Sequence, residues 1–347
     1  MADKRVTIGD IAEAVGLSTS TVSRALSGKG YVAADVKARV VTAAQKIGYV
    51  PDLNARNLRQ GSSTQIGLVV SSILDPFYAE LATGFQEVAR AEGYEVILII
   101  DRADPKEQKA AVKSLIAMGV SAIAITPVSA EAVASVRDFG RPVLQIDRSV
   151  SDANALVAGD NRAGGKMATE HLIGFGHERI ALLIDHDQWT TGRARIEGWR
   201  EAFTERGLAV PEDLIFKLGS SDAEIASGLD RFVGALKTKS ITAIFSANSV
   251  VSQRFYVALG KHGVRVPEDV SVVAYDDALW MTMVTPTISA VSQHVEEMGR
   301  HAAELLIRQI GAGRKGPWPV RTFVQPSLIA RSSVLALHNG RQSSPRL

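Results

Sequence analysis

The sequence contains no cysteine, and this absence excludes several kinds of chemistry at once. Without thiols the chain can form no disulfide bond, no thiolate metal site and no cysteine nucleophile. It also has no run of about eighteen apolar residues, the length that a membrane-spanning helix requires. The opening segment MADKRVTIGD lacks the apolar core of a secretion signal. We therefore expect a cytoplasmic protein with no membrane partner.

Recognisable catalytic and cofactor motifs are missing as well. The segment GDNRAGGKM has the Gly-Lys pair of a phosphate-binding loop, but Asp160 stands where that loop needs glycine and Met167 where it needs serine or threonine. No G-x-G-x-x-G at a strand-to-helix turn, no H-E-x-x-H and no G-x-S-x-G occurs. We expect no enzymatic activity, no cofactor and no metal site.

Positive charge is concentrated at one end of the chain. Residues 1–60 hold nine Lys/Arg and five Asp/Glu, a balance of +4, whereas the remaining residues carry 30 against 32, a balance of −2. A basic N-terminal segment is typical of a small DNA-binding domain, although a basic surface patch without that role would give the same balance.

The first fifty residues predict three short helices. In VTIGDIAEAVGLS, Thr7 is a candidate N-cap, isoleucine, alanine and valine form one apolar stripe, and Gly16 ends the helix. A second helix carries Val22 and Leu26, and a third ends at Gly48. Two helices joined by a short glycine-containing turn, with a third in support, form the helix-turn-helix pattern.

The rest of the chain alternates short apolar strands with helices. Strands such as IGLVV, EVILII, AIAIT and VSVVAYD are separated by helical stretches at 77–92, 105–118, 161–174, 193–206, 222–236 and 248–262. This alternation predicts parallel sheets covered by helices, and its length predicts two doubly wound Rossmann-like lobes with a ligand crevice between them. We expect a DNA-binding domain at 1–50, a linker at 51–64, a core at 65–335 and a disordered tail at 336–347.

With these elements in place, the chain resembles the LacI/GalR (lactose and purine repressor) family of transcriptional regulators. The resemblance is carried by VTIGDIAEAVGLSTSTVSRALSG, GYVPDLNARNLRQG, IGLVVSSILDPFYAEL, DNRAGGKMATEHLIGFGHERIALL, RARIEGW and PEDVSVVAYDD. It implies an all-α helix-turn-helix head and an α/β core of the periplasmic-binding-protein-like type I fold. The core is also similar to ribose-type sugar-binding proteins of bacterial uptake systems.

The resemblance implies how the head would bind double-stranded DNA. Thr19, Ser20 and Arg24 match positions that contact base edges, where arginine can bind guanine and hydroxyls can bind several bases. The residues that match phosphate-binding positions are Thr7, Ser18, Thr21, Ser23 and Tyr31. One departure is Ala33, which stands where the family often has a capping serine, a loss that costs about 1 kcal/mol of helix stability.

The linker matches the family's hinge helix. Leu58 takes the place of the leucine that wedges into the minor groove at the operator centre and kinks the duplex. Asn54, Ala55 and Arg59 would line the same groove.

The resemblance also implies an effector site at the strand ends. The matching positions are Asp75, Phe77, Tyr78, Asp147, Arg148, Arg195, Asn248, Asp276 and Gln293. Carboxylates, amides and guanidinium groups beside aromatic rings suit a polyol, and the adjacent pair Asp147-Arg148 matches the ribose-binding pattern. Where the family usually has aspartate after the asparagine, this chain has Ser249. Trp189, Phe245 and Trp280 could line the pocket or simply pack in the core.

These expectations combine into one function. We expect a homodimeric repressor that binds a pseudo-palindromic operator and is released by a small sugar such as ribose or another pentose. A corepressor-type regulator responding to a nucleoside, a hexose or a sugar phosphate is the alternative, and the residues do not fix the direction of the response.

Overall fold

The chain divides into two units, Met1–Ser63 and Thr64–Leu347, and the described part of the first unit contains three helices. The computed structural model describes residues 6–28, 30–49, 63–185, 187–219, 221–312 and 320–337. Residues 51–62 of the expected linker (51–64) and residues 338–347 of the expected tail (336–347) lie outside the described residues.

The predicted helices of the head are present as α1 (Ile8–Val15), α2 (Thr19–Ser27) and α3 (Ala34–Lys46). Helix α1 begins with a capping box in which the Thr7 side chain accepts from the Asp10 backbone, and it ends at Gly16 with φ of 68°. Helix α3 begins without a side-chain cap at Ala33. The core of this unit is small and is formed by Ile11, Ala12, Val22, Ala25, Val40 and Ala44.

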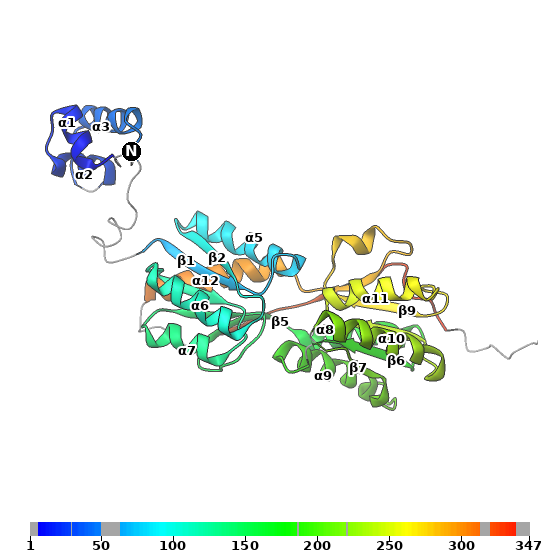
Figure 1. Ribbon diagram of the computed structural model, residues 1–347. Coiled ribbons are helices and arrows are strands. Elements are labelled where there is room, and N and C mark those ends of the chain that lie inside the picture. The colour runs from blue at the N-terminus through cyan, green and yellow to red at the C-terminus, as the bar shows by residue number, and fades with distance from the viewer. Residues whose placement is uncertain are drawn as a thin grey trace, which may run out of the picture. The chain divides into compact units, whose positions relative to one another are not determined.

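The second unit contains two lobes, each built on a six-stranded sheet (Figure 1). The sheet of lobe 1 has the order β11-β5-β4-β3-β1-β2 and is parallel throughout. Its strands are β1 (Gln65–Val70), β2 (Glu95–Ile100), β3 (Ala122–Ile125), β4 (Val143–Ile146), β5 (Ala155–Gly159) and β11 (Arg321–Val324). Its helices are α5 (Pro76–Ala91), α6 (Pro105–Ala117), α7 (Ala130–Asp138) and α12 (Val295–Ala312).

The sheet of lobe 2 has the order β12-β10-β9-β8-β6-β7, in which only the pairing of β12 with β10 is antiparallel. Its strands are β6 (Ile180–Ile184), β7 (Ile215–Lys217), β8 (Ala243–Ser246), β9 (Ser271–Tyr275), β10 (Ser289–Ser292) and β12 (Ser327–Ile329). Its helices are α8 (Asn161–Gly174), α9 (Thr190–Glu205), α10 (Asp222–Thr238) and α11 (Ser249–Lys261), with short 3-10 turns at Glu212–Leu214 and Leu279–Thr282.

The central strands of each sheet are buried on both faces, which explains why they are apolar without alternation. In lobe 1, Leu68 belongs to the cluster with α5 and α12, whereas its neighbour Val69 belongs to the cluster with α6 and α7. Lobe 2 repeats this arrangement, with Leu182 packed toward α8 and α9 and Leu183 toward α10 and α11. The two-lobed α/β fold with a helical head is therefore confirmed.

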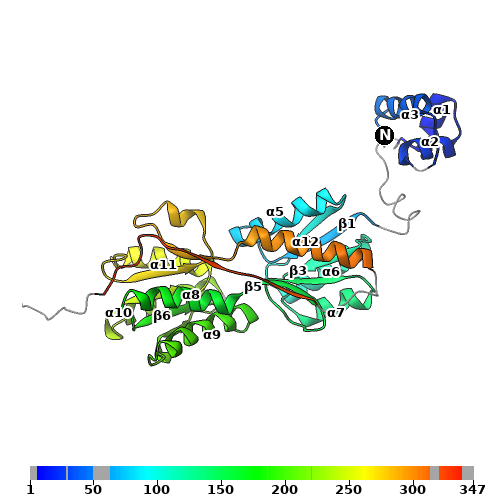
Figure 2. The ribbon, with the colours of Figure 1, turned by 180° about the vertical axis from the view of Figure 1, so that it is seen from behind.

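Three segments of the chain pass from one lobe to the other. They connect β5 to α8, β10 to α12 and β11 to β12, so that α12 packs on α5 in lobe 1 although it follows lobe 2 in sequence (Figure 2). The two sheets place equivalent strands at equivalent positions, because β4 and β9 are each third in their sheet's order. Residues that follow these strands therefore face the same crevice from opposite sides.

Candidate functional site

The surface of α2 carries the residues expected to contact DNA. Thr19, Ser20 and Arg24 are all exposed, while Val22 on the opposite side is fully buried. The Ser18 hydroxyl caps the helix by accepting from the Thr21 backbone at 3.2 Å, and it lies 2.9 Å from the Ser20 hydroxyl. These contacts explain how a helix with several hydroxyls is stable, because the side chains satisfy one another and the helix start.

The remaining predicted DNA contacts are distributed around this helix. Thr7 caps α1 and is exposed, Ser23 is partly buried, and Tyr31 in the loop before α3 is 92% exposed. A tyrosine ring this exposed has no packing role within the head, so it is free to contact another molecule. The hinge residues Asn54, Ala55, Leu58 and Arg59 lie outside the described residues.

A cavity of about 620 Å³ lies between the two lobes, and both contribute to its walls. Of the nine predicted effector residues, eight line this cavity: Asp75, Phe77, Tyr78, Asp147, Arg195, Asn248, Asp276 and Gln293. Arg148 does not line it. The fold thus brings residues more than two hundred positions apart in the sequence to one cavity.

Asp147 and Asp276 occupy equivalent places after β4 and β9, and each has a φ of 69°. Aspartate seldom adopts this left-handed conformation, which costs of the order of 1–3 kcal/mol and is concentrated at functional sites. Asp276 accepts from Gln293 at 2.6 Å and from the Ser249 backbone at 3.3 Å. Among the described residues no donor reaches the carboxylate of Asp147, although that side chain is buried.

Asp75 is held at the start of α5, where its Oδ1 atom accepts from the Phe77 backbone at 3.1 Å. Burial, followed by the nearby charge of Asp276, raises the pKa of Asp75 to about 6. Burial also raises the pKa of Asp147, against the opposing effect of Arg148 and Arg195. The cleft is therefore lined by four carboxylates, those of Asp75, Asp147, Asp185 and Asp276. Burial makes those of Asp75 and Asp147 costly to ionise in the absence of a hydrogen-bonding ligand.

The two arginines of the site are largely occupied by the protein. Arg148 is 2% exposed and donates to the Pro127 carbonyl at 2.9 Å and to the Ser71 hydroxyl at 2.8 Å. Arg195 donates to the Asn161 side chain at 2.7 Å and to the carbonyl of Ala247, and it lies over the Tyr275 ring. Both guanidinium groups are thus fixed in orientation by the fold.

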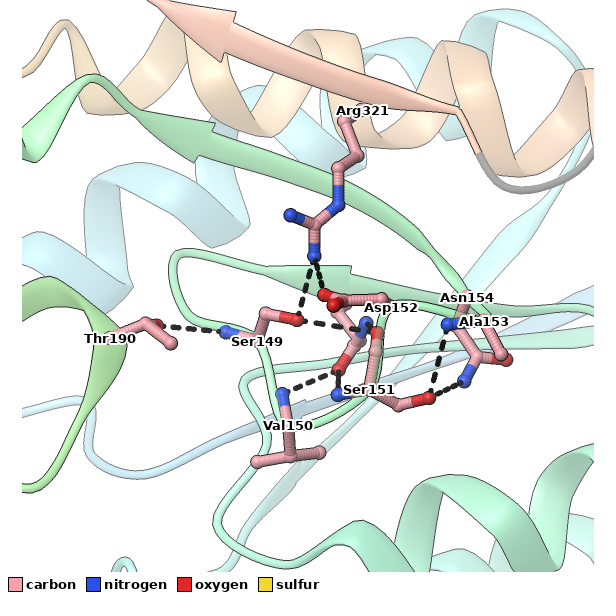
Figure 3. Close-up of polar contacts among 9 residues, drawn as sticks. Ser149, Val150, Ser151, Asp152, Ala153, Asn154, Thr190 and Arg321 are labelled. Carbon is pink, nitrogen blue, oxygen red and sulfur yellow. Dashed lines mark hydrogen bonds and ion pairs between the residues drawn. The ribbon is translucent and has the colours of Figure 1, made fainter.

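The loop that follows Arg148 is held in place by an extensive hydrogen-bond network (Figure 3). The buried side chain of Gln145 donates to the Ser151 carbonyl at 2.7 Å and accepts from the Val150 backbone at 2.9 Å. Arg321 in β11 donates to the Ser149 hydroxyl at 3.2 Å and to Asp152. This network fixes the backbone that presents Asp147 to the cleft.

The lobes are joined directly beside this loop. The Ser149 backbone of lobe 1 donates to the Thr190 hydroxyl of lobe 2 at 3.1 Å (Figure 3). The guanidinium carbon of Arg148 lies 3.7 Å from the centre of the Trp189 ring, which also belongs to lobe 2. These two contacts join the lobes beside the cavity.

The three aromatic residues whose place the sequence left open differ in their environment. Trp189 and Trp280 line the cavity, whereas Phe245 is fully buried in the core of lobe 2 and does not. Sequence analysis noted Ser249 only as a departure from the family's aspartate, and it did not identify Asp185, although both line the cavity. Asp185 directly follows β6 and accepts a hydrogen bond from the Asn248 side chain, so its position at a strand end was a usable signal.

Comparison with known proteins relates this geometry to a family. The model described as bacterial regulatory proteins of the lacI family matches residues 7–52, and a periplasmic binding protein-like domain matches residues 169–334. The ribose operon repressor of Halalkalibacterium halodurans is 30% identical over 305 residues, covering 88% of this chain and 90% of that protein. The chain belongs to the LacI family of bacterial regulatory proteins.

Other LacI-family members align with this chain along nearly its whole length. The repressor PurR of Haemophilus influenzae (strain ATCC 51907) is 27% identical over 95% of this chain and 99% of that protein. A crystal structure of the lac repressor dimer bound to operator and the anti-inducer ONPF superposes with a TM-score of 0.83, at 25% identity over 96% of this chain and 100% of that chain. The resemblance inferred from the sequence is confirmed, and with it the prediction of a DNA-binding transcriptional regulator that is not an enzyme.

Two further observations concern the described part of the chain. None of its helices is long and apolar enough to cross a membrane. Its histidine, aspartate and glutamate side chains form no group of three that could hold a metal ion.

Proposed function

We propose that this LacI-family regulator is a repressor released from its operator by a small neutral sugar, with a pentose such as ribose as the leading candidate. The head at 1–50 and the hinge at 51–64 would bind DNA, and the core at 65–335 would bind the sugar and a second copy of the chain. The regulator would act as a homodimer in the cytoplasm.

The unpartnered carboxylate of Asp147 carries the effector assignment. No hydrogen bond from a described residue reaches this carboxylate, which lines the cavity, so a ligand hydroxyl would donate to it. Asp276 and Asp75 would accept from neighbouring hydroxyls, and Asn248, Gln293 and Arg195 would donate to ligand oxygens.

The charge of the cleft favours a neutral ligand over an anionic one. Four carboxylates line the cavity, those of Asp75, Asp147, Asp185 and Asp276, against the three guanidinium groups of Arg102, Arg195 and Arg254. Negative charge is therefore in excess, and a phosphate group here would meet like charge at short range. The aromatic pair Phe77 and Tyr78, whose ring centres are 5.1 Å apart, offers an apolar surface to the face of a sugar ring.

The relatives support the same class of ligand without deciding its identity. The 30% identical relative from Halalkalibacterium halodurans is a ribose operon repressor. We expect D-ribose to raise the melting temperature of the full chain and to weaken its binding to operator DNA. D-Ribose 5-phosphate, tested at the same concentration, serves as the anionic control and should do neither.

A nucleoside is the second candidate, and cavity size favours it. The cavity measures about 620 Å³, which leaves room for a base. Adenosine and uridine therefore belong in the same titration. If a nucleoside strengthens operator binding while ribose has no effect, the corepressor alternative replaces our proposal.

A further inference from the structure

A single hydrogen bond at the cleft links α11 of lobe 2 to α5 of lobe 1. The Ser249 hydroxyl donates to the Oδ1 atom of Asp75 at 2.9 Å, across 174 positions of sequence. Ser249 is the first residue of α11, and its side chain is 6% exposed. It therefore lies at the boundary between the lobes and not on an outer surface.

The same serine also contacts the carboxylate on its own side of the cleft. Its backbone N–H donates to the Oδ2 atom of Asp276 at 3.3 Å, and the Oδ1 atom of Asp276 accepts from Gln293. One residue thus donates to two carboxylates that belong to different lobes. Without these donors the two groups would face each other across a buried space and repel.

The surroundings of Asp75 show why a neutral donor matters at this position. Three other carboxylates interact with that of Asp75: Asp276 across the cleft, Asp147 in the same lobe, and Glu80 on the helix that Asp75 caps. Burial and Asp276 raise the pKa of Asp75 to about 6, whereas the hydrogen bonds from Phe77 and Ser249 lower it. Ser249 therefore stabilises the ionised form of Asp75 in this arrangement of the lobes.

We propose that Ser249 is a positioning residue that closes the cleft by holding Asp75 and Asp276 together, and that it restricts the effector to ligands that donate hydroxyl groups to these carboxylates. An aspartate at this position would add a further negative charge and could not donate its side chain to Asp75. This proposal concerns the same cleft as the proposed function. Only its statement about the ligand rests on that function.

The test compares thermal unfolding of the full chain at pH 7.5 and pH 5.0 in four proteins: wild type, Ser249→Ala, Asp75→Asn and the double variant. Loss of the hydroxyl removes a donor to the ionised carboxylate, so it costs stability mainly where Asp75 is charged. We expect the melting-temperature deficit of Ser249→Ala to be about twofold larger at pH 7.5 than at pH 5.0. In the Asp75→Asn background the deficit should not depend on pH.

Ser252→Ala is the matched control. Ser252 lies on the same helix at 2% exposure, its hydroxyl donates to the Asn248 carbonyl and to Ser246, and it does not line the cavity. Its deficit should be the same at both pH values. Equal deficits for Ser249→Ala at both pH values, or a pH-dependent deficit that persists with Asp75→Asn, would overturn the proposal.

Ligand binding gives the second readout, with D-ribose as the probe. We expect Ser249→Asp to weaken ribose binding at pH 7.5 by about tenfold more than the neutral Ser249→Asn, because only the former adds charge. If the wild-type protein binds no ribose, the effector assignment fails. The unfolding experiment still decides whether Ser249 has the proposed role, since it requires no ligand.

Discussion

The hydroxyl side chains of α2 do not all have the same freedom to bind DNA. The Ser18 hydroxyl caps the helix and is hydrogen-bonded with Ser20 and Thr21, so a contact from Ser20 to a base must compete with a bond that already exists. Arg24 is exposed, and its Nε atom makes one long contact of 3.4 Å to the Ser20 carbonyl. Its guanidinium group therefore has donors left for an external partner.

This difference leads to a prediction about sequence preference. Arg24→Ala should cost about 1–3 kcal/mol against the preferred operator and relax the preference at one base position, because a forked contact to guanine is lost. Ser23→Ala should weaken binding to all sequences to a similar extent, since a phosphate contact carries no base information. Binding to a set of single-base operator variants measures both. A uniform loss with Arg24→Ala would contradict base reading.

Helices of the core make close backbone contacts that depend on glycine. A Cβ atom added at Gly84 in α5 would lie 2.0 Å from the Glu296 carbonyl oxygen, and one added at Gly299 in α12 would lie 2.2 Å from that of Leu81. The two helices can pack this tightly only because neither residue has a side chain.

Gly299→Ala should therefore destabilise the core by about 1–3 kcal/mol or more, because the backbones of α5 and α12 must separate. Gly311→Ala is the control on the same helix, since nothing lies within 4 Å of a Cβ atom there. It should leave stability unchanged or raise it slightly through helix propensity. Chemical denaturation measures the free energy of unfolding of both variants. Equal losses of stability would refute the packing argument.

The positions of most elements could be predicted from the sequence. The stretch predicted at 161–174 is α8, and the stretch at 248–262 differs from α11 by one residue at each end. Helix α7 was not predicted, because its nine residues are mostly small and depend on packing of Ala132, Val133 and Val136 against lobe 1. Short edge strands such as β7, with three residues, have too little pattern to be recognised.

For the whole molecule, the proposed function couples two distant binding events. Sugar binding between the lobes and operator binding by the head and hinge must affect each other equally, because linkage is reciprocal for binding free energies. If saturating D-ribose weakens operator affinity by a given factor, saturating operator must weaken ribose affinity by the same factor. Titrations in both directions on the dimer measure the two factors. Unequal factors would show that the operator-bound and sugar-bound forms are not linked by one equilibrium.

The sequence by itself determined the class of the protein and the order of its parts. Periodicity gave the helices of the head and the strand–helix alternation of the core, because burial imposes these patterns locally. The resemblance to the LacI/GalR family implied nine effector positions, and eight of them line the cleft.

Only the tertiary structure showed which hydrogen-bond partners these residues have. Only packing shows that Arg148 is occupied by Pro127 and Ser71, or that the carboxylate of Asp147 has no donor among the described residues. The bond between Ser249 and Asp75 likewise joins residues 174 positions apart. Such contacts join residues that are far apart in the sequence, and no local pattern in the sequence encodes them.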